Sequence, residues 1–284
     1  MSDVLIGMTL QPLDADAPPT LESVLAGFDR LREETPLNSV EIWMAPEHRP
    51  RAHVFWPEDY TAERRRAMKA FLARFDYCGV HLPFLFNNYI APNPAVAEPA
   101  LRQLELGVEI AGELGCRYAV MHAEWDNRGF VKEDDNFRRY AAAFGRLCGR
   151  ARAAGLRLCA ETCFFIGDRH RAARMVREGD NAEFGITLDA GKAMRNNGFS
   201  NEAVLELIEE IGPAMGSTHL YDYPSREETA RILPGCGMVD VPAIVARLWR
   251  TGYRGVFSLE TSGTYGPQKR AVEALAAYVD AART

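Results

Sequence analysis

Four short apolar stretches in the second half of the chain each end at a residue that can bind a metal ion or transfer a proton. These residues are Glu161, Asp189, His219 and Glu260. Three carboxylates and one imidazole form a hard, oxygen-rich ligand set that suits Mn²⁺, Mg²⁺ or Co²⁺, and Zn²⁺ is also compatible with it. Any one of them alone would be an ordinary surface or helix-cap residue. Four at the ends of consecutive strands predict a site for one divalent metal ion.

The chain alternates between short apolar stretches and helical stretches, and this alternation places the four residues. The predicted strands are Val4–Leu10, Ser39–Met44, Cys78–Pro83, Arg117–His122, Leu156–Thr162, Gly185–Asp189, Gly216–His219 and Tyr253–Glu260. The predicted helices are Leu21–Arg32, Thr61–Phe75, Ala97–Leu114, Asp134–Ala154, Asp168–Glu178, Ser200–Ile211, Val241–Arg250 and Pro267–Arg283. We expect Thr20 to begin the first helix and Gly155 to end the fourth.

Eight strands, each followed by a helix at a repeat of roughly 30 to 40 residues, predict a single (β/α)8 TIM barrel over residues 1–284. A doubly wound open sheet would place a glycine-rich phosphate-binding turn after an early strand, and the first predicted strand is not followed by one. In a barrel the carboxyl ends of all strands point into one mouth, so the four metal-binding candidates would meet there.

The composition is that of a globular protein inside a cell. The net charge of −6 disfavours nucleic-acid binding, which requires a basic face. No stretch approaches the roughly 18 apolar residues of a membrane span, and the first residues lack the features of a signal peptide. The six cysteines include no CxxC pair. We therefore predict a cytoplasmic protein with reduced thiols, whose partner is a small molecule and not nucleic acid or a membrane.

Five short motifs carry a resemblance to a known family. They are Ala160-Glu-Thr162, Leu188-Asp-Ala-Gly191, His219-Leu-Tyr-Asp222, Leu233-Pro-Gly-Cys-Gly237 and Ser258-Leu-Glu-Thr261. Together they resemble the xylose isomerase-like TIM-barrel superfamily, which includes sugar isomerases, sugar epimerases and endonuclease IV. The resemblance covers nearly the whole chain and is strongest from residue 156 onward. It also allows a homo-oligomer, since members of the superfamily are often dimers or tetramers.

The resemblance implies a role for each of the four candidates. In the sugar 3-epimerases of the superfamily the matching residues bind one divalent ion, for which we expect Mn²⁺ first. The two matching glutamates also exchange a proton with carbon on opposite faces of the substrate. Carried over, this makes Glu161 and Glu260 the acid/base pair as well as metal ligands, while Asp189 and His219 serve as ligands only.

Other positions match the superfamily in part. His81 and His122 stand at the ends of the third and fourth strands, at positions that line the family's site. Arg231 matches an arginine that holds substrate oxygens. The epimerases have a second Glu where this chain has Gly167, and a His where it has Lys192. The metal ligands are therefore kept, whereas part of the shell that recognises ketoses is altered.

The two cations near the predicted mouth, Lys192 and Arg231, need partners, because buried cations without partners are costly. One interpretation pairs them with nearby acids of the protein, for which Glu124, Asp126 and Asp222 are candidates, or has Lys192 point to solvent at the start of a helix. The other gives them an anionic group of the substrate, since Arg offers a bidentate fork and Lys a point charge. The second interpretation favours sugar acids, keto acids or sugar phosphates over neutral ketoses.

The chemistry of such a site leaves three functions open. A divalent cation that chelates a carbonyl and a neighbouring hydroxyl stabilises the enediolate formed when the α-proton leaves. Two glutamates then suffice for a metal-dependent isomerase or epimerase of a sugar or sugar acid, an enzyme of carbohydrate metabolism. The same enediolate allows a lyase, either a dehydratase or a decarboxylase, on a keto-sugar or oxo acid. An endonuclease IV-like phosphodiesterase ranks third, because ligands for its additional metal ions are missing.

Aromatic residues in the predicted loops are candidates to line the substrate site, although such residues are as often packing residues. They are Trp43, Trp56, Phe84, Phe86, Tyr89 and Trp125.

Overall fold

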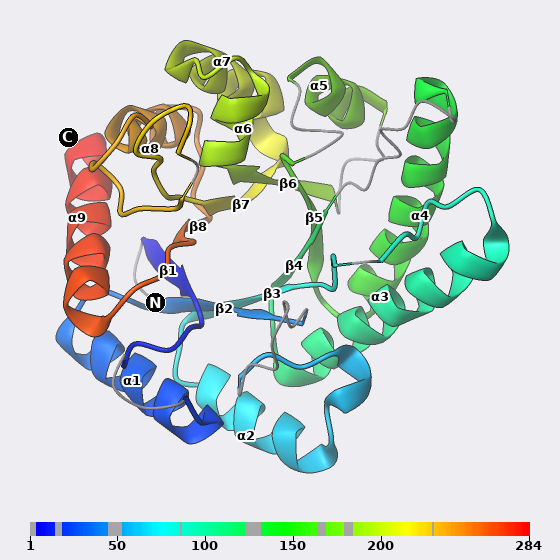
Figure 1. Cartoon of the computed structure of the whole chain (residues 1–284), viewed down its shortest axis with the longest axis horizontal. Coiled ribbons are helices and arrows are strands. Elements are labelled where there is room, and N and C mark those ends of the chain that lie inside the picture. The colour runs from blue at the N-terminus through cyan, green and yellow to red at the C-terminus, as the bar shows by residue number, and fades with distance from the viewer. Residues whose placement is uncertain are drawn as a thin grey trace.

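Eight parallel strands close into a barrel, in the order of the sequence (Figure 1). The computed structural model describes residues 4–14, 19–44, 53–85, 87–122, 132–163, 169–178, 184–228 and 230–284. The strands are β1 (Leu5–Thr9), β2 (Ser39–Trp43), β3 (Tyr77–His81), β4 (Tyr118–His122), β5 (Arg157–Glu161), β6 (Phe184–Asp189), β7 (Met215–His219) and β8 (Val256–Leu259). Because β8 pairs with β1, the sheet closes on itself, and the predicted (β/α)8 TIM barrel is confirmed.

Helices surround the barrel on its outside (Figure 1). They are α1 (Leu21–Glu34), α2 (Ala62–Leu72), α3 (Pro94–Leu114), α4 (Glu133–Ala153), α5 (Arg169–Glu178), α6 (Ala190–Asn196), α7 (Asn201–Ile211), α8 (Val241–Arg250) and α9 (Tyr265–Arg283). Among the described residues, the 3₁₀ helix η1 (Pro57–Asp59) precedes α2, and the 3₁₀ helix η3 (Gly212–Ala214) lies between α7 and β7. None of the helices among the described residues is long and apolar enough to cross a membrane.

The sequence did not predict α6, which follows β6 without a loop. Its N-cap is Asp189, whose side chain accepts a hydrogen bond of 2.7 Å from the backbone N–H of Lys192. A helix of seven residues is too short to display a clear apolar periodicity. This helix matters for function because it brings Lys192 to the end of β6, beside the mouth of the barrel.

The residues at the start of α1 and at the end of α4 have the capping conformations that the sequence predicted. The hydroxyl of Thr20 accepts a hydrogen bond from the backbone of Ser23, and the Ser23 hydroxyl accepts one from Thr20, so the two residues form a capping box at the start of α1. Gly155 follows α4 with a φ of 74°, a left-handed conformation that glycine adopts without strain. The predicted start of the first helix and the predicted end of the fourth are both confirmed.

The core has two parts, one between barrel and helices and one inside the barrel. Inside the barrel, Tyr118, Val120, Cys159 and Val256 form a small buried cluster. Gly79 leaves room for the Tyr118 ring, since a Cβ at this position would lie 2.0 Å from Tyr118 Cζ. Because side chains alternate along a strand, the residues two positions beyond Val120 and Cys159 also point inward. The cluster is therefore the floor beneath the ends of β4 and β5.

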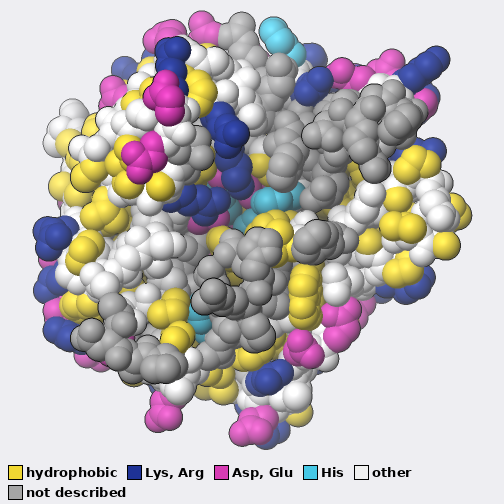
Figure 2. Space-filling view, viewed as in Figure 1, with side chains coloured by type: hydrophobic (Ala, Val, Ile, Leu, Met, Phe, Trp, Pro, Cys, Tyr) yellow, Lys and Arg dark blue, Asp and Glu magenta, His cyan; other side chains and the backbone are white. Residues whose placement is uncertain are grey.

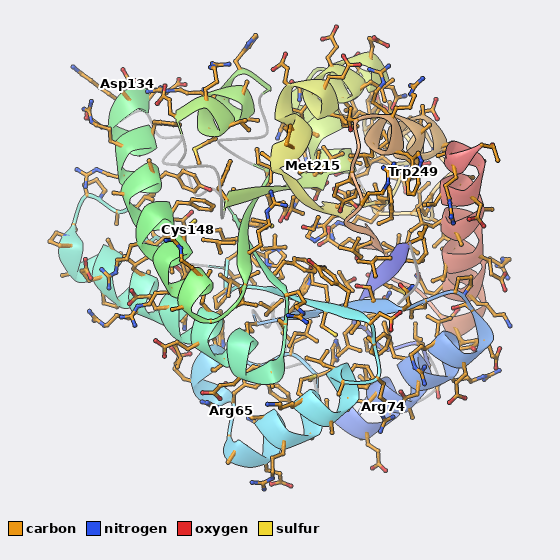
Figure 3. All side chains as sticks on the ribbon, turned by 180° about the vertical axis from the view of Figure 1, so that it is seen from behind. Arg65, Arg74, Asp134, Cys148, Met215 and Trp249 are labelled. Atoms are coloured by element: carbon orange, nitrogen blue, oxygen red, sulfur yellow. The ribbon has the colours of Figure 1, made fainter. Side chains whose placement is uncertain are left out.

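Charged residues cover the outer helices. Figure 3 shows Arg65 and Arg74 at the periphery of the molecule, on α2 and just beyond its end. Arg65 pairs with Glu113 of α3 at 2.6 Å, and Arg64 stacks over the ring of Phe55. Arg65 thus links α2 to α3, and Arg64 packs on the segment that precedes α2.

Candidate metal centre and active site

The four residues singled out by the sequence meet in space. One ligand atom from each of Glu161, Asp189, His219 and Glu260 can be chosen so that all four atoms lie within 4.8 Å of one another. All four side chains are buried. Three of these residues end β5, β6 and β7, and Glu260 directly follows β8. Figure 2, viewed as Figure 1, shows basic, acidic and histidine side chains gathered in a hollow near the middle of the barrel face.

The atoms that face one another in this group are of the kinds that bind a cation. His219 Nδ1 lies 3.5 Å from Glu260 Oε2 and 3.9 Å from Glu161 Oε1. Among the described residues, neither His219 Nδ1 nor Glu260 Oε2 has a hydrogen-bond partner, whereas Asp189 Oδ2 lies 3.2 Å from the ammonium of Lys192. Buried polar atoms normally have partners, so two buried atoms that lack them and face each other fit a metal ion between them. The donor set, three carboxylates and an imidazole, also fits a hard divalent cation.

Glu41 on β2 orients His219, and the sequence analysis missed it. His219 Nε2 lies 3.1 Å from Glu41 Oε1 and 3.2 Å from Glu41 Oε2. Both side chains are fully buried. In this contact Nε2 can donate a hydrogen to the carboxylate oxygens, and the other ring nitrogen, Nδ1, faces the remaining carboxylates. The signal in the sequence was a single acid in the middle of an otherwise apolar strand.

Burial and neighbouring charges shift the pKa values of His219 and Glu260. Burial lowers the pKa of His219, but the carboxylates of Glu41 and Glu260 outweigh it and hold this pKa well above the usual value. Burial also raises the pKa of Glu260, an effect overcome by Arg231 and His219, so that the pKa of Glu260 is lower than usual. The protein thus keeps this carboxyl ionised at neutral pH.

Asp189 is held by the backbone of α6 and by a tyrosine that the sequence did not indicate. Asp189 Oδ1 accepts hydrogen bonds of 2.7 Å from the Tyr221 hydroxyl and of 2.7 Å from the backbone N–H of Lys192. Gly191 makes room for Tyr221, since a Cβ there would lie 2.3 Å from the ring. With Oδ1 occupied, Oδ2 is the oxygen left to face the group. Burial raises the pKa of Asp189 to about 6.

His81 and His122 both contact the carboxylate of Glu161. His81 Nε2 and His122 Nε2 lie 3.1 Å and 3.0 Å from Glu161 Oε2. His81 Nδ1 lies 2.9 Å from the carbonyl oxygen of Leu82, which can only accept, so this nitrogen carries a hydrogen. The contact between His81 Nε2 and Glu161 Oε2 therefore requires a proton on one of these two atoms. Both histidines thus lie beside Glu161, and their role in binding a substrate stays a prediction.

Burial and neighbouring charges have opposing effects on the pKa values of Glu161 and His122. Burial raises the pKa of Glu161, but Lys192 and His122 outweigh burial and hold the pKa of Glu161 well below its usual range. Burial lowers the pKa of His122 to about 4, so this imidazole is neutral at neutral pH and can donate its Nε2 hydrogen to Glu161. The histidines, Glu161 and the metal-type ligands thus form one continuous polar network. A second group that could hold a metal ion consists of His81, His122 and Glu161.

Lys192 and Arg231 lie at the site, but their partners differ from those expected. Lys192 Nζ contacts Glu161 Oε1 and lies 3.2 Å from Asp189 Oδ2. Arg231 NH1 lies 2.7 Å from Glu260 Oε1. The partners are therefore the candidate metal ligands themselves.

The three acids predicted to pair with Lys192 and Arg231 were Asp222, Glu124 and Asp126. Asp222 accepts hydrogen bonds from the backbone N–H groups of Tyr223, Gly237 and Val239. Its two oxygens serve the loop after β7, so the expectation that Asp222 pairs with a cation is not supported. The other two, Glu124 and Asp126, lie outside the described residues, as does Gly167.

Some of the predicted aromatic residues pack around the two histidines. The ring of Phe84 lies 4.8 Å from that of His81 and 4.4 Å from that of His122. Trp43 packs against His81 at 5.6 Å, and the Tyr89 hydroxyl donates to the carbonyl oxygen of His122. Of the remaining candidates, Trp56 caps η1, while Phe86 and Trp125 lie outside the described residues.

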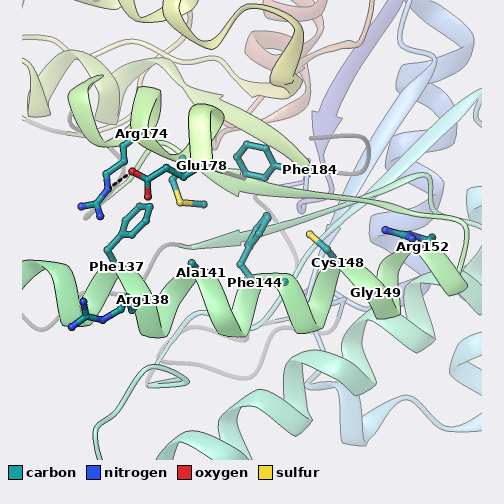
Figure 4. A pocket seen from close by; sticks show the side chains of 12 residues that line it. Phe137, Arg138, Ala141, Phe144, Cys148, Gly149, Arg152, Arg174, Glu178 and Phe184 are labelled. Carbon is teal, nitrogen blue, oxygen red and sulfur yellow. Dashed lines mark hydrogen bonds and ion pairs between the residues drawn. The ribbon is translucent and has the colours of Figure 1, made fainter. Parts of the chain in front are cut away.

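A second hollow lies on the outside of the barrel, between α4 and α5 (Figure 4). It has a volume of about 640 Å³, and apolar side chains such as Phe137, Phe144 and Phe184 line it. Two of its charged residues satisfy each other, because Arg174 Nε lies 3.0 Å from Glu178 Oε1. This hollow does not include the carboxyl ends of the strands, where the titratable groups converge.

Comparisons with known proteins agree with this geometry. The model of the family described as xylose isomerase-like TIM barrel matches residues 30–281. The chain belongs to this family. Among curated proteins, none matches the sequence significantly. The predicted resemblance to the xylose isomerase-like TIM barrels is thereby confirmed, and the family name agrees with the closed eight-stranded barrel.

Several solved structures share the fold over nearly the whole chain. A D-tagatose 3-epimerase-like protein has a TM-score of 0.77 at 18% identity, with 99% of this chain and 98% of that chain covered. An L-ribulose 3-epimerase has a TM-score of 0.74 at 17% identity, with coverages of 99% and 96%. A 3-keto-D-glucoside 4-epimerase from E. coli has a TM-score of 0.70 at 16% identity, with coverages of 97% and 98%. At these identities the likeness establishes the fold.

Proposed function

We propose that this protein is a divalent-metal-dependent isomerase or epimerase of a sugar or sugar acid. The observation that carries the proposal is the convergence of Glu161, Asp189, His219 and Glu260, with ligand atoms within 4.8 Å of one another. The similar structures support it, because they include an L-ribulose 3-epimerase, a 3-keto-D-glucoside 4-epimerase and a D-tagatose 3-epimerase-like protein.

The four residues are the ones that would hold the ion, with Mn²⁺ as the first choice. A bound divalent ion would supply Lewis-acid stabilisation of the negative charge that develops on the substrate oxygens. The residues around the ligands act on the ligands themselves: Glu41 fixes the ring of His219, and Tyr221 fixes Asp189. Each ligand is thus held in one orientation before a substrate arrives, which limits the reorganisation that the reaction requires.

Glu161 and Glu260 are the proposed acid/base pair. Both have a pKa below the usual range, so both are ionised at neutral pH and can accept a proton from carbon. They lie on different sides of His219, at the end of β5 and after β8. The Nε2 atoms of His81 and His122 both contact Oε2 of Glu161 and hold this carboxylate in place. Glu260 is held instead by Arg231, through its Oε1.

The two cations support a substrate with an acidic group. Lys192 and Arg231 both lie at the mouth, and their side chains are 22% and 29% exposed, whereas the carboxylates beneath them are almost completely buried. A guanidinium has five N–H donors, so pairing with Glu260 leaves Arg231 donors for a ligand. We therefore place sugar acids, keto acids and sugar phosphates ahead of neutral ketoses.

A test follows the α-proton. The protein, loaded with Mn²⁺, is incubated in deuterated water with ketoses and their acid and phosphate counterparts, and deuterium at the carbon next to the carbonyl is measured by NMR. We expect exchange together with an isomer or epimer of the substrate. In Glu260→Gln, exchange and turnover should fall by about 10²- to 10⁴-fold, the usual contribution of a general base.

The products distinguish the alternative. A product that has lost water or CO₂ would identify the lyase. Exchange at the parent rate in a folded Glu260→Gln would exclude Glu260 as acid or base. An exposed acid such as Glu202 on α7 provides the matched control, because Glu202→Gln changes the charge equally at a distance from the mouth.

A further inference from the structure

Lys192 contacts the oxygens that a metal ion at the proposed site would also bind. Its ammonium contacts Glu161 Oε1, the carboxylate oxygen that lies 3.9 Å from His219 Nδ1, and it lies 3.2 Å from Asp189 Oδ2. Asp189 Oδ1 is already occupied by two hydrogen bonds, so Oδ2 is the oxygen of Asp189 that remains for a cation. The ammonium and a metal ion therefore compete for the same two oxygen atoms.

Arg231 provides a contrast within the same site. Its guanidinium binds Glu260 Oε1, whereas Glu260 Oε2 is the oxygen that lies 3.5 Å from His219 Nδ1 and makes no hydrogen bond among the described residues. Arg231 thus holds the outer oxygen of its carboxylate and leaves the inner one for a metal ion. Lys192 instead contacts Glu161 Oε1 and Asp189 Oδ2, the oxygens that remain for a metal ion. The two cations therefore differ in whether they leave the metal-binding oxygens open.

We propose that Lys192 is an internal cation that competes with the divalent ion for Glu161 and Asp189, and that its ammonium moves toward the barrel mouth when the ion binds. This inference rests on the metal site of the proposed function and adds a regulation of that site. A divalent cation and an ammonium on the same oxygens repel each other across a short distance in a buried site, and this repulsion disfavours binding of both at once. Binding of the ion therefore includes the displacement of Lys192.

The position of Lys192 on the fold allows this movement. Its backbone is fixed, since its N–H donates to Asp189 Oδ1 in the first turn of α6. Its side chain is 22% exposed, while the side chains of Glu161 and Asp189 are fully buried. A four-carbon stem can swing its ammonium into water and leave the backbone in place. The released ammonium then lies at the mouth, where the acidic group of a substrate would enter.

The internal cation also stabilises the protein when no ion is bound. Glu161 and Asp189 are buried, and a buried carboxylate without a partner strongly destabilises a fold. Lys192 supplies that partner, because its ammonium contacts Glu161 Oε1 and lies 3.2 Å from Asp189 Oδ2. Removing the charge should therefore weaken the metal-free protein and strengthen its binding of metal ions.

The experiment measures metal affinity directly. Mn²⁺ is titrated into the metal-free full chain by isothermal titration calorimetry at fixed pH and salt, for the parent, Lys192→Gln and Lys69→Gln. Lys69 is an exposed residue on the outer helix α2, so Lys69→Gln changes the net charge by the same amount at a distance from the mouth. We expect the Kd for Mn²⁺ to fall by about tenfold or more in Lys192→Gln, within the usual range of coupling between two sites, and to stay unchanged in the control.

Thermal unfolding provides a second readout that is independent of activity. With EDTA, Lys192→Gln should unfold at a lower Tm than the parent, and saturating Mn²⁺ should raise its Tm by more than it raises that of the parent. Arg231→Gln should tighten Mn²⁺ binding less than Lys192→Gln does. If Lys192→Gln does not fold without metal, the same titration is run on Lys192→Met and on protein refolded in the presence of Mn²⁺.

The outcomes distinguish a failure of the proposed metal site from a failure of the proposed role of Lys192. A parent that binds no divalent ion would contradict the proposed function. A parent that binds Mn²⁺, with Lys192→Gln and Lys192→Met binding it equally or more weakly, would overturn the internal cation and leave the metal site standing. Equal tightening in Lys69→Gln would also overturn it, because the effect would then be one of overall charge.

Discussion

His219 Nε2 lies 3.1 Å from Glu41 Oε1, and through this contact a residue of β2 determines which ring nitrogen of His219 faces the candidate metal ligands. The two residues are 178 positions apart in the chain and both are fully buried. The carboxylate accepts the hydrogen of Nε2, so Nδ1 is turned toward Glu161 and Glu260. An imidazole fixed in this way has a defined tautomer and a higher basicity as a ligand.

Glu41→Gln tests this relationship. The amide is similar in size but carries no charge, so it holds the ring less firmly and makes it a weaker ligand. We expect the Kd for Mn²⁺ to rise by about 10- to 100-fold, as is typical when the partner of a metal-binding histidine is changed. Calorimetric titration of Mn²⁺ measures this, with Glu202→Gln on α7 as the control. Unchanged affinity in a folded variant would mean that Glu41 does not position the ligand.

The number of metal ions per chain is the second prediction. We expect one ion in the parent and none in the double variant Glu161→Gln with Asp189→Asn, which removes two of the three carboxylates of the group. Elemental analysis of protein dialysed against a dilute metal buffer gives the ratio. Retention of the ion in the double variant would contradict the site. A ratio of two in the parent would point to a second ion held by His81, His122 and Glu161.

The third prediction concerns the charge of the substrate. The parent should have a higher kcat/KM for sugar acids or sugar phosphates than for neutral sugars of the same length. In Lys192→Met this preference should fall roughly 10- to 100-fold, which corresponds to the loss of one hydrogen bond to a charged group. Kinetics on paired substrates at saturating Mn²⁺ separates this effect from that on metal affinity. A parent that prefers neutral sugars, or a variant with undiminished preference for anions, would refute the idea.

The fourth prediction uses the thiols as probes of the fold. Burial disfavours the thiolate, and it raises the pKa of Cys78 to about 12 and that of Cys159 to about 11. These groups therefore stay protonated and unreactive from pH 7 to pH 9, and their reactivity should rise only as the pH approaches 11. Cys236 is exposed and should react first with a thiol reagent such as 5,5′-dithiobis(2-nitrobenzoate).

Mass spectrometry of the labelled protein identifies the cysteine that reacts. Fast labelling at pH 8 should disappear in Cys236→Ser, and all six cysteines should react in guanidinium. Fast labelling of Cys159 in the folded protein would contradict its place inside the barrel.

The sequence by itself determined the barrel and the four converging residues. Alternating strands and helices leave few arrangements, and the carboxyl ends of parallel strands in a barrel meet at one mouth. Residues at the ends of consecutive strands, such as Glu161 and Asp189, therefore become neighbours whatever the details of packing. The same rule placed His81 and His122 beside Glu161, because β3, β4 and β5 are adjacent in the closed sheet.

Only the tertiary structure decided which side chains support and neutralise this group. Glu41 lies in the middle of β2, and nothing in its local sequence shows that closure of the barrel brings it to His219 on β7. Lys192 reaches Asp189 because α6 begins directly after that residue, and a helix of seven residues is too short to be predicted from periodicity. Tyr221 reaches Asp189 from the segment that follows β7. Hydrogen-bond and ion-pair partners depend on distances of a few tenths of an ångström between distant segments, and such distances are set when the chain packs.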